Sequence, residues 1–325
     1  MFQETRPLGK TGILVPRVGL GCATFGREID EDTSFAIMDY AVEHGITLFD
    51  TAEAYGGGQA HESRRQKLGL DEQREVTKEF HSSEKIIGRW LRSRGLRKQI
   101  ILVSKITTDL NSEHIRTALE QSLERLQTEY LDLYLFHRFD PQTPLEESLS
   151  AMHEARRSGA ILVAGCSNFS ANQLAQALEI SSRIGVERLE VSETIYNLID
   201  REAENSILPL CREQQLGFFG YSPIAAGFLT GKYRRNGFRA LSGTRFNVVP
   251  DYEKLYFRNE SFSIAEKLQI VAEHTGISSA QLATAWALSH PDVTSVLIGA
   301  RSTSHVQNAI EASQLAASGN MPRLD

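Results

Sequence analysis

The chain has 325 residues, of which 41% are hydrophobic and 23% charged. This composition is typical of a soluble globular protein and excludes a disordered or collagen-like chain. Its 35 Lys and Arg residues against 41 Asp and Glu residues give a formal net charge of −6. This balance argues against a nucleic-acid-binding surface, because affinity for phosphate backbones needs clustered basic residues.

The sequence carries no signal for secretion or membrane insertion. Its first residues include no apolar run, and no stretch approaches the roughly 20 apolar residues that a spanning helix needs. Three cysteines, Cys22, Cys166 and Cys211, lie far apart without a C-x-x-C pair, which predicts neither disulfides nor a zinc site. We therefore expect a cytoplasmic protein with no metal site, no membrane association and no nucleic-acid partner.

Short apolar runs alternate with amphipathic helical stretches along almost the whole chain. Near-continuous apolar runs are typical of strands that are buried on both faces of a parallel sheet. Eight runs of this kind are predicted strands: 17–22, 47–51, 100–105, 131–137, 161–167, 189–196, 218–222 and 295–299. Eight strands with helical crossovers and no long linker favour an α/β fold of the (β/α)8 TIM-barrel type, with residues 1–325 as one domain.

Helices are predicted between these strands, at 33–43, 112–126, 145–157, 171–178 and 202–213. Asn111 and Ser170 can cap two of them. Helix ends are expected near Gly45, Gly95, Gly159, Gly185 and Gly217. The alternative fold is an open doubly wound sheet, but the glycines of residues 19–26 do not fit the G-x-G-x-x-G turn that such sheets usually carry.

Two segments lie outside the eight strand–helix units. Residues 1–16 contain a Gly9-Lys10-Thr11-Gly12 turn between short apolar pieces, which predicts an N-terminal β-hairpin that closes the bottom of the barrel. Residues 58–81 are very polar and follow the second strand, so we expect an insertion at the barrel mouth. It could be a lid, a partner contact or a solvated helix.

Four ionisable residues stand at the carboxyl ends of predicted strands or in the loops that follow, where barrel active sites form: Asp50, Tyr55, Lys105 and His137. Each has an ordinary structural alternative, such as a helix cap for Asp50. Together, however, a lysine held by Asp50 would lower the pKa of the Tyr55 phenol. With His137 as a hydrogen-bonding partner, this phenol could protonate a carbonyl oxygen while hydride reaches the carbon.

These residues belong to a longer pattern that resembles the aldo-keto reductases over essentially the whole chain. The matching stretches are 19–21, 49–52, 55–56, 104–105, 133–137, 165–169, 196–198, 221–224, 231–233 and 298–301. The segment 222–233 looks most like the branch that holds bacterial sugar and general carbonyl reductases and the potassium-channel β subunits.

The resemblance implies a small-molecule carbonyl substrate and NADP(H), with NAD(H) less favoured. It places Asp50, Tyr55, Lys105 and His137 on the family's catalytic tetrad, with Tyr55 as the general acid in reduction. It implies cofactor contacts from Gly21, Cys22, Ser167, Asn168, Glu193, Tyr221, Ser222, Pro223, Ile224, Ala226, Lys232, Arg245, Gly299, Arg301, Ser302, His305 and Asn308.

Two positions depart from the family's pattern. Glu193 stands where the family usually has a Gln that contacts the nicotinamide carboxamide. A carboxylate there would favour the oxidised, positively charged nicotinamide and bias the protein toward slow turnover or oxidation. The Glu-then-Asn pair that contacts adenine in the family appears as Asn308-Ala309, which predicts weaker adenine contacts.

Two other functions stay open beside a carbonyl reductase. One is a nucleotide-sensing regulatory subunit with slow turnover, in which the insertion binds a partner. The other is a Schiff-base lyase with Lys105 as the nucleophile. We expect the substrate pocket to be lined by Phe25, Tyr55, Arg138, Phe139, the insertion and the region around Phe228. An oligomer is possible.

Overall fold

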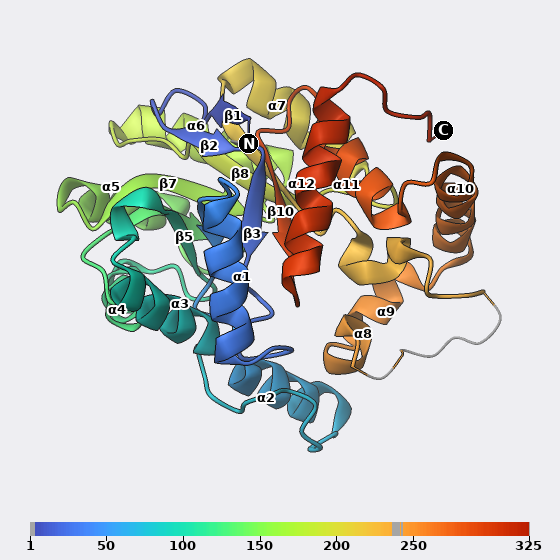
Figure 1. Ribbon diagram of the computed structural model, residues 1–325. Coiled ribbons are helices and arrows are strands. Elements are labelled where there is room, and N and C mark those ends of the chain that lie inside the picture. The colour runs from blue at the N-terminus through green and yellow to red at the C-terminus, as the bar shows by residue number, and fades with distance from the viewer. Residues whose placement is uncertain (1–3, 236–240, 242, 325) are drawn as a thin grey trace.

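A closed barrel of eight parallel strands forms the centre of the computed structural model, which describes residues 4–235, 241 and 243–324 (Figure 1). The strands are β3 (Val18–Gly21), β4 (Leu48–Asp50), β5 (Ile101–Ile106), β6 (Leu131–Phe136), β7 (Ile161–Ser167), β8 (Val191–Ile195), β9 (Gly217–Tyr221) and β10 (Ser295–Gly299). Strand β10 pairs with both β3 and β9 and so closes the barrel. The predicted (β/α)8 barrel is confirmed, and every predicted strand is present with ends shifted by no more than two residues.

Helices that follow the strands along the chain surround the barrel (Figure 1). They are α1 (Glu31–Glu43), α3 (Ser82–Arg94), α4 (Ser112–Leu126), α5 (Leu145–Arg157), α6 (Ala171–Ile184), α7 (Ile207–Gln214), α11 (Ser279–Ser289) and α12 (Thr303–Ala317). The predicted caps are confirmed, because Asn111 accepts a hydrogen bond from the backbone N–H of His114 and Ser170 accepts one from that of Gln173. The helix predicted at 202–213 is instead a 3-10 turn, Glu202–Asn205, followed by α7.

One predicted helix end is wrong. Gly217 is the first residue of β9, and α7 ends at Gln214 with Gln215 as its C-cap, which has a φ of 56°. A Cβ on Gly217 would lie 2.4 Å from Cδ1 of Leu8. The glycine is therefore explained by close packing of the N-terminal segment against the barrel rather than by a helix cap.

The N-terminal hairpin is confirmed as a plug at one end of the barrel. Its strands β1 (Thr5–Pro7) and β2 (Leu14–Pro16) pair in antiparallel fashion. Leu8 and Val15 are fully buried against the apolar interior of the barrel, in a cluster with Leu48, Val103, Leu133, Leu135, Val163, Val191, Phe219 and Leu297. This end is sealed, so any open site must lie at the other end.

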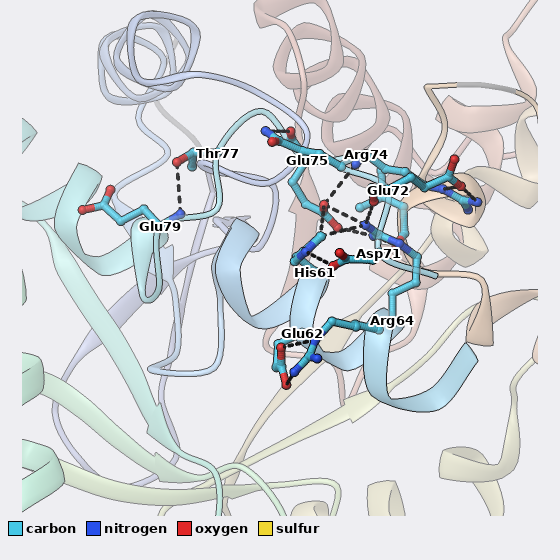
Figure 2. Close-up of polar contacts among 12 residues, drawn as sticks. His61, Glu62, Arg64, Asp71, Glu72, Arg74, Glu75, Thr77 and Glu79 are labelled. Carbon is cyan, nitrogen blue, oxygen red and sulfur yellow. Dashed lines mark hydrogen bonds and ion pairs between the residues drawn. The ribbon is translucent and has the colours of Figure 1, made fainter. Parts of the chain in front are cut away.

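The polar insertion follows β4, as predicted, and begins with α2 (Gly57–Leu68) before an extended stretch leads to α3. Its core is an ion pair in which the buried Arg64 guanidinium contacts both carboxylate oxygens of Glu75 (Figure 2). Arg64 also donates to the carbonyl oxygen of Val248 at 3.3 Å, and Arg74 donates to that of Asn247 at 2.7 Å. The insertion is therefore a folded segment that is fastened to residues 247–248.

The segment that holds the insertion belongs to a group of helices between β9 and β10. These are the 3-10 helix η3 (Ala225–Thr230), α8 (Arg245–Val248), α9 (Asp251–Tyr256) and α10 (Asn259–Thr275). They share an aromatic core of Phe228, Tyr233, Phe246, Tyr256 and Phe262. Helices α2 and α8 lie at the end of the barrel opposite the hairpin, around its mouth (Figure 1).

Candidate active site

A cavity of about 1150 Å³ opens at the carboxyl ends of the barrel strands. Its wall includes Asp50 at the end of β4, Tyr55 in the loop that follows, and His137 directly after β6. Lys105 on β5 is fully buried behind this wall and donates to Asp50 Oδ1 and, at 3.0 Å, to the carbonyl oxygen of Thr51. The fold thus brings the four predicted catalytic side chains together.

The aromatic ring of Tyr55 lies close to both Lys105 and His137. Nζ of Lys105 is 5.3 Å from the centroid of the Tyr55 ring. The imidazole of His137 lies 5.5 Å from it, centroid to centroid, with the two ring planes nearly perpendicular at 84°. Nδ1 of His137 is 3.2 Å from the hydroxyl of Thr107.

Burial sets the charge states of these groups. Burial alone would lower the pKa of Lys105, but Asp50 and Glu193 outweigh it and raise that pKa above its usual value. Lys105 is therefore protonated at neutral pH, which weighs against a Schiff-base mechanism because that chemistry needs a neutral amine. Burial, with smaller contributions from Lys105 and Arg138, lowers the pKa of His137 to about 3, so its imidazole is neutral at physiological pH.

The expected effect of Lys105 on Tyr55 is outweighed in this structure. Lys105 does lower the pKa of Tyr55, but burial of the phenol is the larger effect and raises that pKa above its usual value. The sequence could not weigh these two effects, because the burial of Tyr55 depends on packing from several loops. The phenol is consequently protonated, as a proton donor must be.

Most of the predicted cofactor residues line the same cavity: Gly21, Ser167, Asn168, Glu193, Tyr221, Ser222, Pro223, Ile224, Ala226, Lys232, Arg245, Gly299, Arg301, His305 and Asn308. Cys22 and Ser302 are absent from its wall. Cys22 is fully buried with its thiol 3.4 Å from the carbonyl oxygen of Leu20, since neighbouring residues at a strand end point in opposite directions. Ser302 is the N-cap position of α12, and its hydroxyl contacts Ser304 at 2.8 Å.

A network of hydrogen bonds joins the ends of three strands beside the tetrad. The amide nitrogen of Asn168 donates to the carbonyl oxygen of His137 and to the hydroxyl of Ser167, both at 3.0 Å. The hydroxyl of Tyr221 donates to Oδ1 of Asn168 at 2.7 Å. Asn168 has a φ of 59°, a left-handed conformation that Asn tolerates better than most residues. The network fixes the side chains that face the cavity.

Another part of the wall gathers positive charge. Burial followed by Arg301 lowers the pKa of Lys232, and burial followed by Arg301 and Lys232 lowers the pKa of His305, so these groups lie close enough to repel one another. Nε of Arg245 is buried and has no hydrogen-bond partner among the described residues. Converging cations and an unpaired guanidinium N–H suit phosphate oxygens, so this wall fits a phosphorylated dinucleotide.

Some residues of the wall were not predicted. Arg27 and Glu28, from the loop after β3, contact each other at 2.8 Å, and Oε1 of Glu28 lies 3.8 Å from Arg245 Nη1. Tyr252 on α9 accepts from Arg245 at 3.4 Å. Arg27 and Glu28 follow shortly after a predicted strand, and this position could have identified them as cavity residues. Nothing in the sequence indicated that Tyr252 lines the cavity.

The expected substrate pocket is partly corrected. Arg138 and Phe139 line the cavity with Tyr55. The region around Phe228 also lines it, through Ala226, Gly227 and Thr230. The side chains of Phe25 and Phe228 themselves do not, because Phe25 is buried in the main core and Phe228 in the aromatic core beside η3. The insertion lies beside the cavity rather than in its wall: the cavity lining includes no residue from 57 to 81.

Two negative findings apply to the part of the chain that the structure describes. Within it, no group of three or more His, Cys, Asp or Glu side chains is arranged to hold a metal ion. None of its helices has the length and apolar composition needed to cross a membrane.

Comparison with known proteins agrees with this architecture. The model of the aldo/keto reductase family matches residues 17–320. The chain is 32% identical over 322 residues to the uncharacterized oxidoreductase YrpG of Bacillus subtilis, a match that covers 95% of this chain and 90% of that protein. It is 32% identical over 311 residues to the aldo-keto reductase YhdN of the same organism, covering 92% and 85%.

A plant protein is similar to the same extent. The chain is 31% identical over 323 residues to a probable voltage-gated potassium channel subunit beta of Arabidopsis thaliana, covering 95% of this chain and 90% of that one. The family model spans nearly all of the barrel, from β3 beyond the end of α12. The chain therefore belongs to the aldo/keto reductase family.

Proposed function

We propose that this protein reduces an aldehyde or ketone to an alcohol with a nicotinamide dinucleotide, and that Tyr55 is the proton donor. The observation that carries the proposal is the position of a protonated Tyr55 in the cavity wall, next to the Lys105–Asp50 ion pair and to a neutral His137. This is the arrangement that proton delivery to a carbonyl oxygen requires.

The wall of the cavity supports a specific orientation for the dinucleotide. Ser167, Asn168 and Tyr221 lie beside the tetrad and offer hydroxyl and amide groups to the nicotinamide. Lys232, Arg245 and Arg301 offer cations to the phosphates. Three cations in the wall exceed what a pyrophosphate alone needs, which favours NADP(H) over NAD(H). When bound, the reduced nicotinamide supplies the hydride.

The side chains of the tetrad then divide the proton chemistry. Tyr55 donates its O–H to the substrate oxygen and transfers the proton as negative charge develops there. The Lys105 cation stabilises the resulting phenolate, and Asp50 holds Lys105 in place. Nδ1 of His137 can accept from the Thr107 hydroxyl, which leaves its Nε2–H to donate to the same substrate oxygen.

The similarity to a potassium channel subunit beta favours a second candidate, a nucleotide-sensing subunit with slow turnover. Its partner surface would be the insertion, whose Leu68, Leu70, Val76 and Phe80 are exposed.

One experiment separates the two. Oxidation of NADPH and NADH by the purified protein is measured with a panel of aldehydes, ketosugars and quinones. The reductase predicts turnover with at least one carbonyl compound and a preference for NADPH. Tight dinucleotide binding with no turnover on the whole panel would refute the reductase and favour the sensing subunit.

A further inference from the structure

The buried cation of the site has one carboxylate more than the proposed reaction uses. Lys105 contacts Asp50 on one side, and its Nζ also lies 3.4 Å from Oε2 of Glu193 on β8. The side chains of all three residues are at most 5% exposed. Oε1 of Glu193 lies 3.4 Å from the Ser167 hydroxyl, whereas Oε2 has no hydrogen-bond partner among the described residues.

The two carboxylates and the ammonium group cannot all be charged in this buried site without a cost in free energy. With both acids ionised, one negative charge would be buried without compensation, which is unfavourable in a low-dielectric interior. One proton shared between the two acids restores neutrality, as in other close carboxylate pairs. Burial raises the pKa of both acids, but Lys105 counteracts it at Asp50, whereas at Glu193 the neighbouring Asp50 adds to it and the pKa rises to about 8. We therefore assign the shared proton to Glu193 at neutral pH.

The other titratable neighbours of Glu193 do not supply a compensating charge. On β7, the pKa of the Cys166 thiol is raised well above its usual value by burial, so the thiol is neutral. Tyr55 in the loop after β4 and Tyr221 on β9 also interact with Glu193, and burial raises the pKa of both phenols. Glu193 therefore titrates against Asp50 and Lys105 alone among its described neighbours.

Glu193 also lies where it can respond to the dinucleotide. It lines the same cavity as Ser167, Asn168 and Tyr221, the residues that we assign to the nicotinamide. The oxidised nicotinamide ring carries a positive charge and the reduced ring does not. A positive ring next to Glu193 favours its ionised form, since an opposite charge nearby lowers the pKa of an acid.

We propose that Glu193 is a proton-coupling residue, which loses its proton to solvent when the oxidised dinucleotide binds and keeps it when the reduced dinucleotide binds. The inference rests on the proposed function, because it requires that a nicotinamide dinucleotide binds in this cavity. The net charge of the site stays the same, because the positive charge of the oxidised ring replaces that of the released proton. As a consequence, the preference of the protein for one redox form of the dinucleotide depends on pH.

The direction and size of the effect follow from linkage. Binding that releases a proton becomes stronger as pH rises, until Glu193 is already ionised in the free protein. Each unit by which the bound ring lowers the pKa of Glu193 changes affinity about tenfold. Other groups that titrate near the dinucleotide, such as His305, affect both redox forms, so the ratio of the two dissociation constants isolates Glu193.

The test is a titration of NADP⁺ and of NADPH by calorimetry between about pH 6 and pH 9, repeated in buffers with different ionisation enthalpies to count protons. The samples are the wild type, Glu193→Gln and the control Glu53→Gln. Glu53 is another carboxylate near this end of the barrel. Its carboxylate accepts from the backbone N–H of Thr107, and only its backbone N–H reaches Lys105, at the carbonyl oxygen of that residue. Gln preserves the shape of either side chain and removes its titration.

For the wild type and Glu53→Gln we expect affinity for NADP⁺ relative to NADPH to rise about tenfold across this range, with proton release only on NADP⁺ binding. For Glu193→Gln we expect a constant ratio and no such release. A constant ratio in the wild type, or a ratio that still rises in Glu193→Gln, would overturn the inference and leave the proposed function standing. Failure of the wild type to bind either dinucleotide would refute the proposed function itself.

A second measurement needs no variant. A protonated carboxylic acid has an infrared carbonyl band that disappears on ionisation. We expect one such band of the wild type at neutral pH to weaken clearly on adding NADP⁺ and to stay unchanged on adding NADPH. Weakening of the band with both forms, or with neither, would contradict the proton-coupling role.

Discussion

The insertion depends on one buried ion pair, and this dependence can be tested with a pair of adjacent arginines. The side chains of Arg64 and Glu75 are 1% and 0% exposed, and Arg64 also donates to the carbonyl oxygens of Glu72 and Val248. Arg64→Met leaves the Glu75 carboxylate buried without its cation. Removing one partner of a buried pair costs about 3–5 kcal/mol.

This cost should appear as local opening, because the insertion can expose Glu75 to water without unfolding the barrel. Hydrogen exchange should therefore become faster in residues 57–81 and 245–251 of Arg64→Met, while amides of the barrel strands keep their protection. The matched control is Arg65→Met. Arg65 is the next residue along α2, but its side chain is 53% exposed and pairs with Glu62 at the surface. The control should leave exchange unchanged.

The double variant Arg64→Met/Glu75→Leu provides a further check. It removes both charges, so protection of the insertion should recover in part. Equal exchange in Arg64→Met and Arg65→Met would refute the reasoning, since it would mean that the buried pair does not hold the insertion in place. No recovery in the double variant would show that the lost contacts with Val248, rather than the uncompensated charge, dominate.

Three further predictions follow from the site and its surroundings. As pH rises from about 4.5 to about 8, the free energy of unfolding of Glu193→Gln in urea should increase by more than about 1 kcal/mol relative to that of the wild type. The reason is that the raised pKa of Glu193 makes the wild type lose stability over that window. Parallel curves of stability against pH would contradict this. Arg301→Met should reduce the preference for NADPH over NADH about tenfold in steady-state kinetics, because a charged hydrogen bond to phosphate is lost; an unchanged preference would place the extra phosphate elsewhere. Gly57→Ala should destabilise the insertion by about 1–3 kcal/mol in exchange measurements, since a Cβ there would lie 1.8 Å from the carbonyl oxygen of Thr77; normal protection would show that the backbone can yield.

The barrel could be predicted because its strands are buried on both faces and therefore read as continuous apolar runs. The convergence of Asp50, Lys105 and His137 could be predicted because they lie at or next to the ends of three of those runs, and a parallel barrel brings strand ends together. The cap residues Asn111 and Ser170 carried local signals that tertiary packing did not override.

What escaped prediction depends on packing between distant segments. The net shift of the Tyr55 pKa balances burial against Lys105, and only the folded loops set that balance. The attachment of Arg64 to Val248 spans 184 positions. The residue before Cys22 lines the cavity, whereas Cys22 itself is buried and points away from it. The pattern of the strand end did not show which of these two neighbours faces the cavity.

The central claim is that Tyr55 delivers the proton, and the most direct test is Tyr55→Phe, with NADPH oxidation and NADPH binding measured on the same sample. We expect turnover with the best carbonyl substrate to fall by about 10²–10⁴-fold, because the variant lacks the acidic hydroxyl. The dissociation constant of NADPH should stay within about twofold, since the phosphate-binding wall is untouched. Turnover retained in Tyr55→Phe would contradict the account.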